Sequence, residues 1–192
     1  MAVFVFQILK TPSNVPLIIL DRDGVINYDS DEYIKSPEEW VPIPGSLEAI
    51  ARLNQAGYQV VVATNQSGLA RGYFDIATLD RIHKKMHDAL ALHGGKVAAL
   101  FYCPHGPDEG CDCRKPRPGL FEQIARQFTV NLKGVPAIGD SLRDVEAARA
   151  VGARPILVRT GKGSRVAQQD VPGDVPLYAD LAAAVDALLA KK

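Results

Sequence analysis

The sequence predicts an α/β fold, a doubly wound (Rossmann-like) parallel sheet, and three features of the 192-residue chain lead to this prediction. Short apolar runs recur along the chain, segments with helical spacing separate them, and each run ends at polar residues or glycine. Runs that are apolar throughout suit strands buried on both faces, and strands that alternate with helices form parallel sheets. The length suits one domain, so we expect a single domain over residues 1–192.

Five apolar runs supply the predicted strands. The first is Leu17–Leu20, which stops abruptly at Asp21. The others cover 58–63, 97–102, 135–138 and 155–158. Because ligands bind beyond the carboxyl ends of the strands in such sheets, the polar residues just past each run are the candidates for a functional site.

Apolar residues at helical spacing fill the intervals between the runs. Ser46 is the expected N-cap of the first helix. Further helices are expected after Asp75, from Pro118, and over 142–151 and 181–189. The Gly- and Pro-rich segment 161–176 reads as a surface loop, and residues 1–16 read as an extra strand or an N-terminal arm. Since no sizeable insertion separates the motifs described below, we expect no cap domain.

The first motif with chemical potential is LDRDGVIN, which begins at Leu20. Asp21 and Asp23 leave the end of a buried strand, and Gly24 permits a tight turn. An ionised carboxylate can attack phosphorus and form an aspartyl-phosphate, while a second carboxyl protonates the leaving oxygen and then deprotonates water. Asp21 is therefore the candidate nucleophile and Asp23 the candidate general acid and base. For this pair taken alone, a solvated turn is the alternative.

Two further motifs can hold phosphate. TNQSG begins at Thr64 and offers a hydroxyl, amides and backbone N–H groups at a strand end. CRKP contains Arg114, which can grip phosphate with two hydrogen bonds, and Lys115, which supplies a point charge. An ordinary polar loop and a solvated basic loop are the alternatives.

The motif GDSLRD follows the fourth predicted strand and carries two acidic residues. Asp140 stands at the strand end and can complete a magnesium site with Asp21, because Mg²⁺ prefers hard oxygen ligands. Asp144 lies one helical turn further on. It can orient the ligands, or it can cap the start of the next helix.

A cluster of soft ligands occupies the segment 103–113. Cys103, His105, Cys111 and Cys113 can close a tetrahedral zinc site, and they include every cysteine of the chain. Four protein ligands leave no open position, so we interpret this zinc as structural, with the task of holding the loop that leads to Arg114. Reduced cysteines without metal are the alternative.

Composition excludes several classes of partner. Lys plus Arg and Asp plus Glu both number 22, and a net charge of zero argues against nucleic acid. No apolar run has the length of a membrane span, and the N-terminus lacks the features of a signal peptide, so we expect a cytoplasmic protein without membrane contact.

His83 and His87 stand four residues apart, where an exposed helix face is favoured over a metal site.

The ordered set of motifs resembles the haloacid dehalogenase (HAD) superfamily of phosphatases over roughly residues 17–161. With VVATNQSGLARG, YCPH, CDCRKPRPG and LVRTGKG it is most similar to the members that remove the 7-phosphate of D-glycero-D-manno-heptose 1,7-bisphosphate, a step toward the lipopolysaccharide core. Histidinol-phosphate phosphatases, which share DRDG and the zinc loop, are the alternative. A zinc-stabilised binding module without catalysis and an oligonucleotide-end phosphatase are weaker alternatives.

The resemblance implies a role for each matching residue and a monomeric enzyme with catalytic Mg²⁺ and structural Zn²⁺. Magnesium is held by Asp21, the backbone carbonyl of Asp23, and Asp140. The phosphoryl group and the sugar are contacted by Thr64, Asn65, Gln66, Ser67, Arg114 and Lys115, and by Asp29 and Tyr33 in the stretch after the first motif. Ser141 departs from relatives that carry Lys after the motif's first aspartate, so one contact to a second phosphate is missing or replaced.

Overall fold

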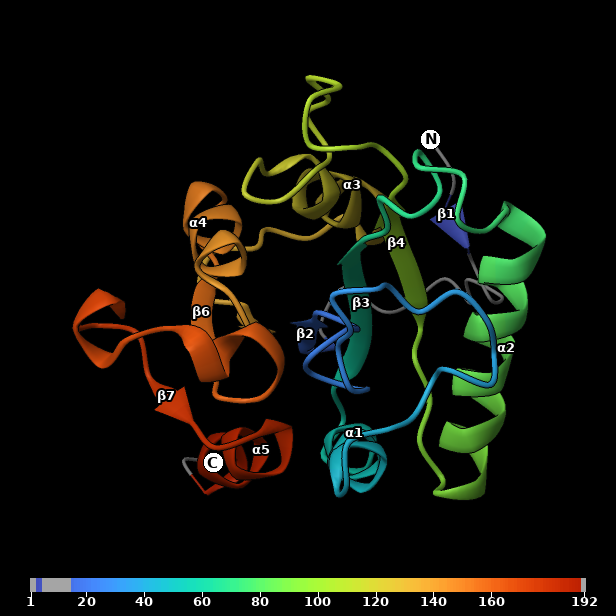
Figure 1. Ribbon diagram of the computed structural model, residues 1–192. Helices are drawn as coiled ribbons and strands as arrows, with labels where there is room; N and C mark the ends of the chain where they lie inside the picture. The colour runs from blue at the N-terminus through green and yellow to red at the C-terminus, as the bar shows by residue number, and fades with distance from the viewer. Residues whose placement is uncertain (1–2, 5–14, 191–192) are drawn as a thin grey trace.

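The computed structural model describes residues 3–4 and 15–190, and a seven-stranded sheet forms its centre (Figure 1). The strands are β1 (Val3–Phe4), β2 (Leu17–Leu20), β3 (Gln59–Asn65), β4 (Ala99–Cys103), β5 (Pro136–Gly139), β6 (Arg154–Val158) and β7 (Leu177–Tyr178). Their order across the sheet is β1-β4-β3-β2-β5-β6-β7. All neighbouring pairs are parallel except β1 with β4. The predicted doubly wound parallel sheet is thus confirmed, with an antiparallel edge strand added.

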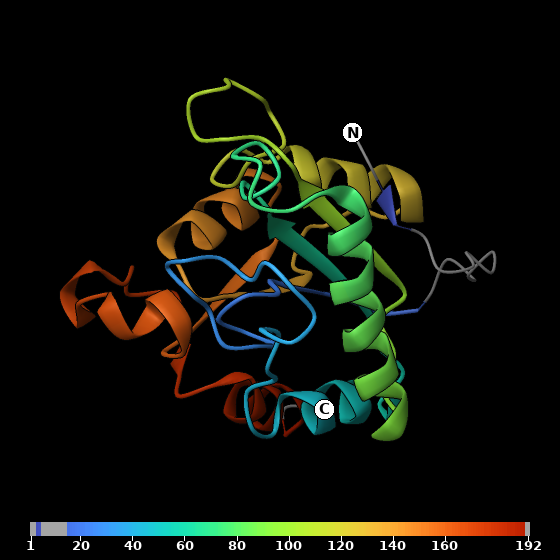
Figure 2. The same ribbon diagram turned by 45° about the vertical axis from the view of Figure 1, so that its right-hand side comes forward.

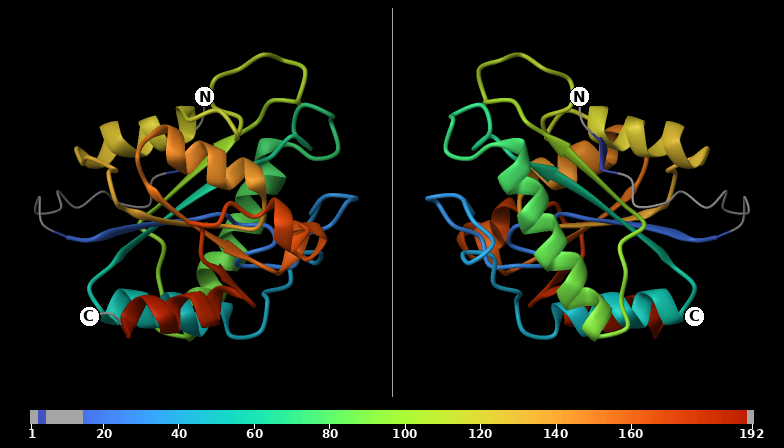
Figure 3. Two further views of the ribbon diagram at one scale, coloured as in Figure 1. Left: turned by 90° about the vertical axis from the view of Figure 1, so that its left-hand side faces the viewer. Right: turned by 90° about the vertical axis from the view of Figure 1, so that its right-hand side faces the viewer.

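Helices cover both faces of this sheet (Figure 3). They are α1 (Ser46–Gln55), α2 (Ile76–Leu92), α3 (Gly119–Phe128), α4 (Leu142–Ala150) and α5 (Leu181–Leu189). Side chains alternate along β2, so Ile18 and Leu20 pack with α1, α2 and α5, whereas Leu17 and Ile19 pack with α3 and α4. Both layers are apolar, which explains why the strands are apolar throughout.

Three sequence-based expectations meet a different or partial outcome. Ser46 is not an N-cap: Gly45, with φ of 81°, precedes the helix, and the Ser46 hydroxyl donates to the carbonyl oxygen of Ile26 at 2.6 Å. The segment 161–176 is not only a loop, because it contains two short 3-10 helices, 161–165 and 168–170. The N-terminal arm lies outside the described residues except for β1 and residues 15–16.

The topology places a crevice at the carboxyl end of β2. From β2 the chain moves to β3 and β4 on one side, then crosses to β5 on the other side of β2. Such a reversal of strand order leaves a gap where ligands bind in open α/β sheets. The loops that follow the strands gather at this end (Figures 2 and 3), and across residues 15–190 none of them holds a separate cap domain. Within the same residues, no helix is both long and apolar enough to cross a membrane.

Candidate active site

A polar pocket of about 220 Å³ opens at the carboxyl ends of β2, β3 and β5. The structure brings together in its walls all the residues singled out for catalysis and substrate binding. They are Asp21, Asp23, Asp29, Tyr33, Thr64, Asn65, Gln66, Ser67, Arg114, Lys115 and Asp140. Each of the three strands contributes at its end, since Asp21 follows β2, Thr64 is the second-to-last residue of β3 and Asp140 follows β5.

Lys115 is the cation at the floor of this pocket. Its ammonium group lies 2.9 Å from Asp21 Oδ2 and 2.5 Å from Asp144 Oδ1, and it donates to the carbonyl oxygen of Ala63 at 2.8 Å. Only 3% of the side chain is exposed. Three acceptors thus use the three protons of the ammonium group, which fixes Lys115 beside the candidate nucleophile.

Three carboxylates, those of Asp21, Asp140 and Asp144, lie near the single ammonium group of Lys115. One oxygen each from Asp21, Asp140 and Asp144 lie within 4.8 Å of one another. Burial, and then the charges of Asp144 and Asp23, raise the pKa of Asp21 to about 7 against the pull of Lys115. Burial and the neighbouring Asp21 likewise raise the pKa of Asp140 to about 8. Hard carboxylate oxygens gathered in one buried, negatively charged place fit a divalent cation such as Mg²⁺.

Asp144 has one of the two roles that the sequence left open, since it caps the start of α4, and it also binds Lys115. Its Oδ2 accepts from the Ser141 backbone N–H at 3.0 Å and from the Ser141 hydroxyl at 2.5 Å, which caps the start of α4. Its Oδ1 takes the ammonium of Lys115. Burial opposes ionisation, but Lys115 and the bonds from Ser141 outweigh it and lower the pKa of Asp144. Asp144 therefore stays charged and holds Lys115 in place.

Two glycines allow the backbone to close around Asp140. Gly24 and Gly161 both have positive φ, of 79° and 55°. A side chain at either position would overlap Asp140 Oδ2. The backbone N–H of Lys162 donates to the same oxygen at 2.7 Å, and Thr160 Oγ1 donates to the carbonyl of Gly24 at 2.5 Å. Hydrogen bonds therefore hold the loop after β6 against the loop after β2, and the glycines make room for this close approach.

Asp23 is held by four donated hydrogen bonds. Arg22 donates to both carboxylate oxygens, at 3.0 and 2.9 Å, and Asn27 and Gln66 each add one, at 2.9 and 2.8 Å. Gln66 also donates to Thr64 Oγ1 at 2.9 Å. The side-chain amide of Asn65 instead pairs with the backbone of Lys115 through two bonds of 3.1 Å. Gln66 thus links Asp23 to Thr64, and Asn65 anchors the loop that carries Lys115.

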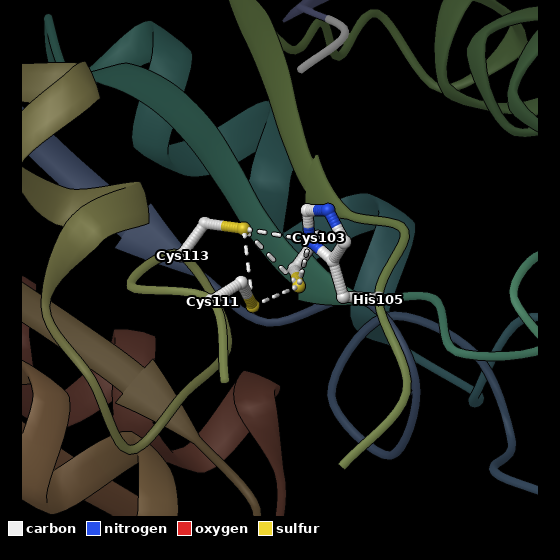
Figure 4. A group of neighbouring side chains, drawn as sticks. All are labelled: Cys103, His105, Cys111 and Cys113. Atoms are coloured by element: carbon white, nitrogen blue, oxygen red, sulfur yellow. Dashed lines mark hydrogen bonds between the residues drawn. The ribbon is translucent and has the colours of Figure 1, made fainter. Parts of the chain in front are cut away.

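The Cys/His cluster lies beside this loop and has the shape of a closed metal site (Figure 4). Cys111 Sγ is 3.6 Å from the sulfurs of both Cys103 and Cys113, which are 3.3 Å apart. His105 Nδ1 lies 3.6 Å from Cys103 Sγ and 3.3 Å from Cys113 Sγ. In a tetrahedral site with Zn–S bonds of about 2.3 Å, sulfurs stand about 3.8 Å apart. The four side chains therefore fit zinc and already point at one centre.

Several pocket residues escaped the sequence analysis. Lys162 and Arg143 line the pocket, and the Lys162 ammonium forms an ion pair with Asp29. Lys162 lies shortly after the end of β6, so it too belongs to the polar residues beyond a strand end that are candidates for a functional site. Sequence analysis passed over it because the Gly-rich segment around it indicated a surface loop. His83 was expected on an exposed helix face, yet only 1% of it is exposed, and it contacts Arg22.

Comparison with known families agrees with this geometry. A family model described as HAD-hydrolase-like matches residues 112–184, and a model described as polynucleotide kinase 3 phosphatase matches residues 17–141. The second match covers more than half of the chain and spans the first three motifs together with Asp140.

Closely similar proteins belong to one phosphatase family. The D-glycero-beta-D-manno-heptose-1,7-bisphosphate 7-phosphatase of Bordetella bronchiseptica is 61% identical over 174 residues, which is 90% of this chain and 97% of that protein. The Pseudomonas aeruginosa protein of the same name is 57% identical over 173 residues, with the same two coverages. A crystal structure of D,D-heptose 1,7-bisphosphate phosphatase from B. bronchiseptica, complexed with magnesium and phosphate, has a TM-score of 0.90 and 59% identity. It covers 92% of this chain and 99% of its own. The chain therefore belongs to the HAD superfamily and, within it, to the D-glycero-beta-D-manno-heptose-1,7-bisphosphate 7-phosphatase family.

Proposed function

We propose that this protein is a phosphoric monoester hydrolase that removes the 7-phosphate of D-glycero-β-D-manno-heptose 1,7-bisphosphate and leaves the heptose 1-phosphate, through an aspartyl-phosphate on Asp21. The observation that carries the proposal is the pairing of Asp21 with a buried ammonium 2.9 Å away, at the end of β2 and beside Asp140. The names of the close relatives support this choice of substrate and anomer.

The chain's own residues account for both halves of the reaction. Asp21 attacks phosphorus, and Lys115 and Thr64 stabilise the charge on the transferring phosphoryl group. Asp23 donates a proton to the leaving sugar oxygen and then removes one from the attacking water. Arg114 and Arg143 line the same pocket and suit the second phosphate of the substrate. Ser141 caps α4, and Arg143 supplies the positive charge that some relatives obtain from a lysine at the position of Ser141.

Magnesium is the proposed cofactor of this site. Asp21 and Asp140 would hold it together with the backbone carbonyl of Asp23, and Asp144 stands close enough to orient its waters. When bound, Mg²⁺ offsets the negative charge that collects between the nucleophile and the phosphate. The B. bronchiseptica relative was solved in complex with magnesium and phosphate, which supports the assignment.

A direct substrate comparison tests the proposed function. We expect phosphate release from the β-anomer of the heptose bisphosphate with a kcat/KM at least about tenfold above that for the α-anomer and for histidinol phosphate, because each poor fit costs roughly 1–3 kcal/mol at the transition state. One phosphate should be released per molecule. A clear preference for histidinol phosphate would show that this ester, and not the heptose bisphosphate, is the substrate. Inactivity toward all phosphomonoesters would instead favour the zinc-stabilised binding module without catalysis.

The crowded carboxylates predict how magnesium affects stability. Asp21 and Asp140 have folded pKa values of about 7 and about 8, above the ordinary 3.8, so they retain protons that the unfolded chain releases. Their contribution to the metal-free protein therefore falls as pH rises from about 4 to about 8. Bound Mg²⁺ would offset the repulsion between the ionised carboxylates of Asp21 and Asp140. We therefore expect added Mg²⁺ to raise the Tm more at about pH 8 than at about pH 5. An equal rise at both pH values, or the same rise in Asp140→Asn, would contradict the assignment.

Zinc at the Cys/His cluster is proposed as structural. Its task would be to fix the chain that leads directly from Cys113 into Arg114 and Lys115. We expect one zinc per chain by elemental analysis of protein purified without chelator. Cys113→Ser should lose this zinc and about 2–5 kcal/mol of stability. As a matched control, Ser164→Cys adds a thiol outside the cluster and should leave the zinc content unchanged. Protein without zinc but with full activity would refute the structural role.

The remaining proposals concern the setting of the enzyme. We propose a cytoplasmic monomer that binds a small phosphorylated sugar and neither nucleic acid nor membrane. Three cysteines placed for metal rather than disulfides suit a reducing compartment, and the net charge of zero suits a small substrate.

A further inference from the structure

Behind the pocket, the side chain of Arg22 is enclosed between Asp23 and a histidine of helix α2. None of Arg22 is exposed, and only 1% of His83 is. The guanidinium donates through Nε and Nη2 to the two oxygens of Asp23, at 3.0 and 2.9 Å. Its third nitrogen, Nη1, lies 3.0 Å from His83 Nε2. One planar group therefore joins Asp23 to a residue 61 positions from Arg22 in the sequence.

The direction of the bond between Arg22 and His83 follows from chemistry. A guanidinium has donors and no acceptor, so His83 Nε2 must accept, and the imidazole is neutral with its proton on Nδ1. Burial, together with the adjacent charge of Arg22, lowers the pKa of His83 to about 2. The ring therefore remains an acceptor throughout the working pH range of an enzyme and does not act as a proton donor.

Helix α2 gives this contact a rigid support. Leu79, Ile82 and Met86, which flank His83 on the same helix, are fully buried in the core. A two-pronged fork fixes the plane of a carboxylate as well as its position. Asp23 needs such control, because one oxygen of its carboxyl group must meet the leaving oxygen of the substrate at hydrogen-bond distance.

We infer that His83 is a positioning residue for the phosphatase reaction: by accepting from Arg22, it holds the Arg22 fork in the plane that aims the Asp23 carboxyl at the leaving group. The inference rests on the proposed function, in which Asp23 is the general acid and base. Without the acceptor, the buried Nη1–H of Arg22 has no hydrogen-bond partner, and the cost of leaving it unsatisfied favours a rotation of the guanidinium away from Asp23. The nucleophile Asp21 and its partner Lys115 do not touch His83 in the contacts described above.

Leaving groups of different acidity separate this role from a general loss of structure. The alkoxide of the heptose needs a proton to depart, whereas 2,4-dinitrophenolate does not. The parameter kcat/KM covers the steps up to phosphoryl transfer to Asp21. For His83→Met we expect kcat/KM to fall at least about tenfold with the heptose bisphosphate, part of the roughly 10²–10⁴-fold supplied by a general acid. With 2,4-dinitrophenyl phosphate it should fall less than about threefold.

Matched variants complete the test. His83→Gln keeps an acceptor near the position of Nε2 and should restore kcat/KM to within about threefold for both esters. His87→Met changes the same helix one turn on and should leave the ratio between the esters unchanged. His83→Asn is polar but too short to reach Arg22, and replaces His83→Met should that variant not fold.

The outcomes distinguish the inference from the proposed function. Equal losses with both esters in folded His83→Met, or no loss with either, would overturn the positioning role while the proposed function stands. A wild-type protein that hydrolyses neither ester would overturn the proposed function and the inference together. A loss confined to the heptose ester, recovered in His83→Gln, is the result that supports both.

Discussion

Asp21→Asn is expected to abolish turnover, with kcat lowered by at least about 10³-fold, while the protein stays folded. The amide has no anionic oxygen with which to attack phosphorus. Its shape is nearly that of Asp21, so the backbone bond from Asp21 to Ile138, of 2.9 Å, is preserved. The measurements are phosphate release and thermal unfolding on the same sample.

The stability of this variant carries separate information. Burial and the neighbouring carboxylates raise the pKa of Asp21, so its charge is unfavourable in the metal-free fold. We therefore expect the Tm of metal-free Asp21→Asn at about pH 8 to be no lower than that of the wild type. Asp186→Asn, the same change at an exposed residue, should leave activity intact. Wild-type turnover in Asp21→Asn would rule out the covalent route.

Lys115→Met is expected to remove both activity and stability. The substitution takes away the ammonium that contacts Asp21 at 2.9 Å and Asp144 at 2.5 Å and leaves these carboxylates without a cation. Breaking a buried pair in this way typically costs about 3–5 kcal/mol, and protonation of Asp21 at low pH should reduce the loss. We expect kcat to fall at least about 10³-fold, because the same charge stabilises the transferring phosphoryl group.

A second Lys→Met change provides the contrast. Lys84 is 70% exposed on α2 and pairs with Asp88 at 2.6 Å, a surface ion pair worth about 0–1 kcal/mol. Denaturant unfolding should therefore separate Lys84→Met from Lys115→Met by about 2 kcal/mol or more, with activity lost only in the latter. Similar stability of the two variants would contradict the buried network described here.

The strands and the strand-end aspartates could be predicted because each depends on local pattern. Continuous apolar runs mark strands covered on both faces, and this single rule located Asp21, Thr64 and Asp140 at one edge of the sheet. The rule fails where a contact joins distant segments. Nothing local in the sequence around His83 indicates that a fully buried Arg22 will meet it.

Ser46 and Lys162 illustrate the same limit in loops. Ser46 has the right chemistry for an N-cap, yet the carbonyl of Ile26, twenty residues earlier, offers its hydroxyl a better partner at 2.6 Å. Lys162 enters the pocket because Gly161 adopts a positive φ of 55° that lets the backbone approach Asp140. In both places tertiary contacts decide the outcome, and composition alone suggested a cap or a surface loop.

Direct detection of phosphate on Asp21 tests the central claim, that this residue is the nucleophile. Asp23→Asn should slow the attack of water, so that with 2,4-dinitrophenyl phosphate, which needs no general acid, the phosphoenzyme accumulates. After rapid acid quench and proteolysis, mass spectrometry should find one phosphoryl group on the peptide that contains Asp21, and none in the Asp21→Asn/Asp23→Asn double variant. An unmodified Asp21 peptide in Asp23→Asn during steady release of dinitrophenol, or phosphate on another residue, would contradict the account.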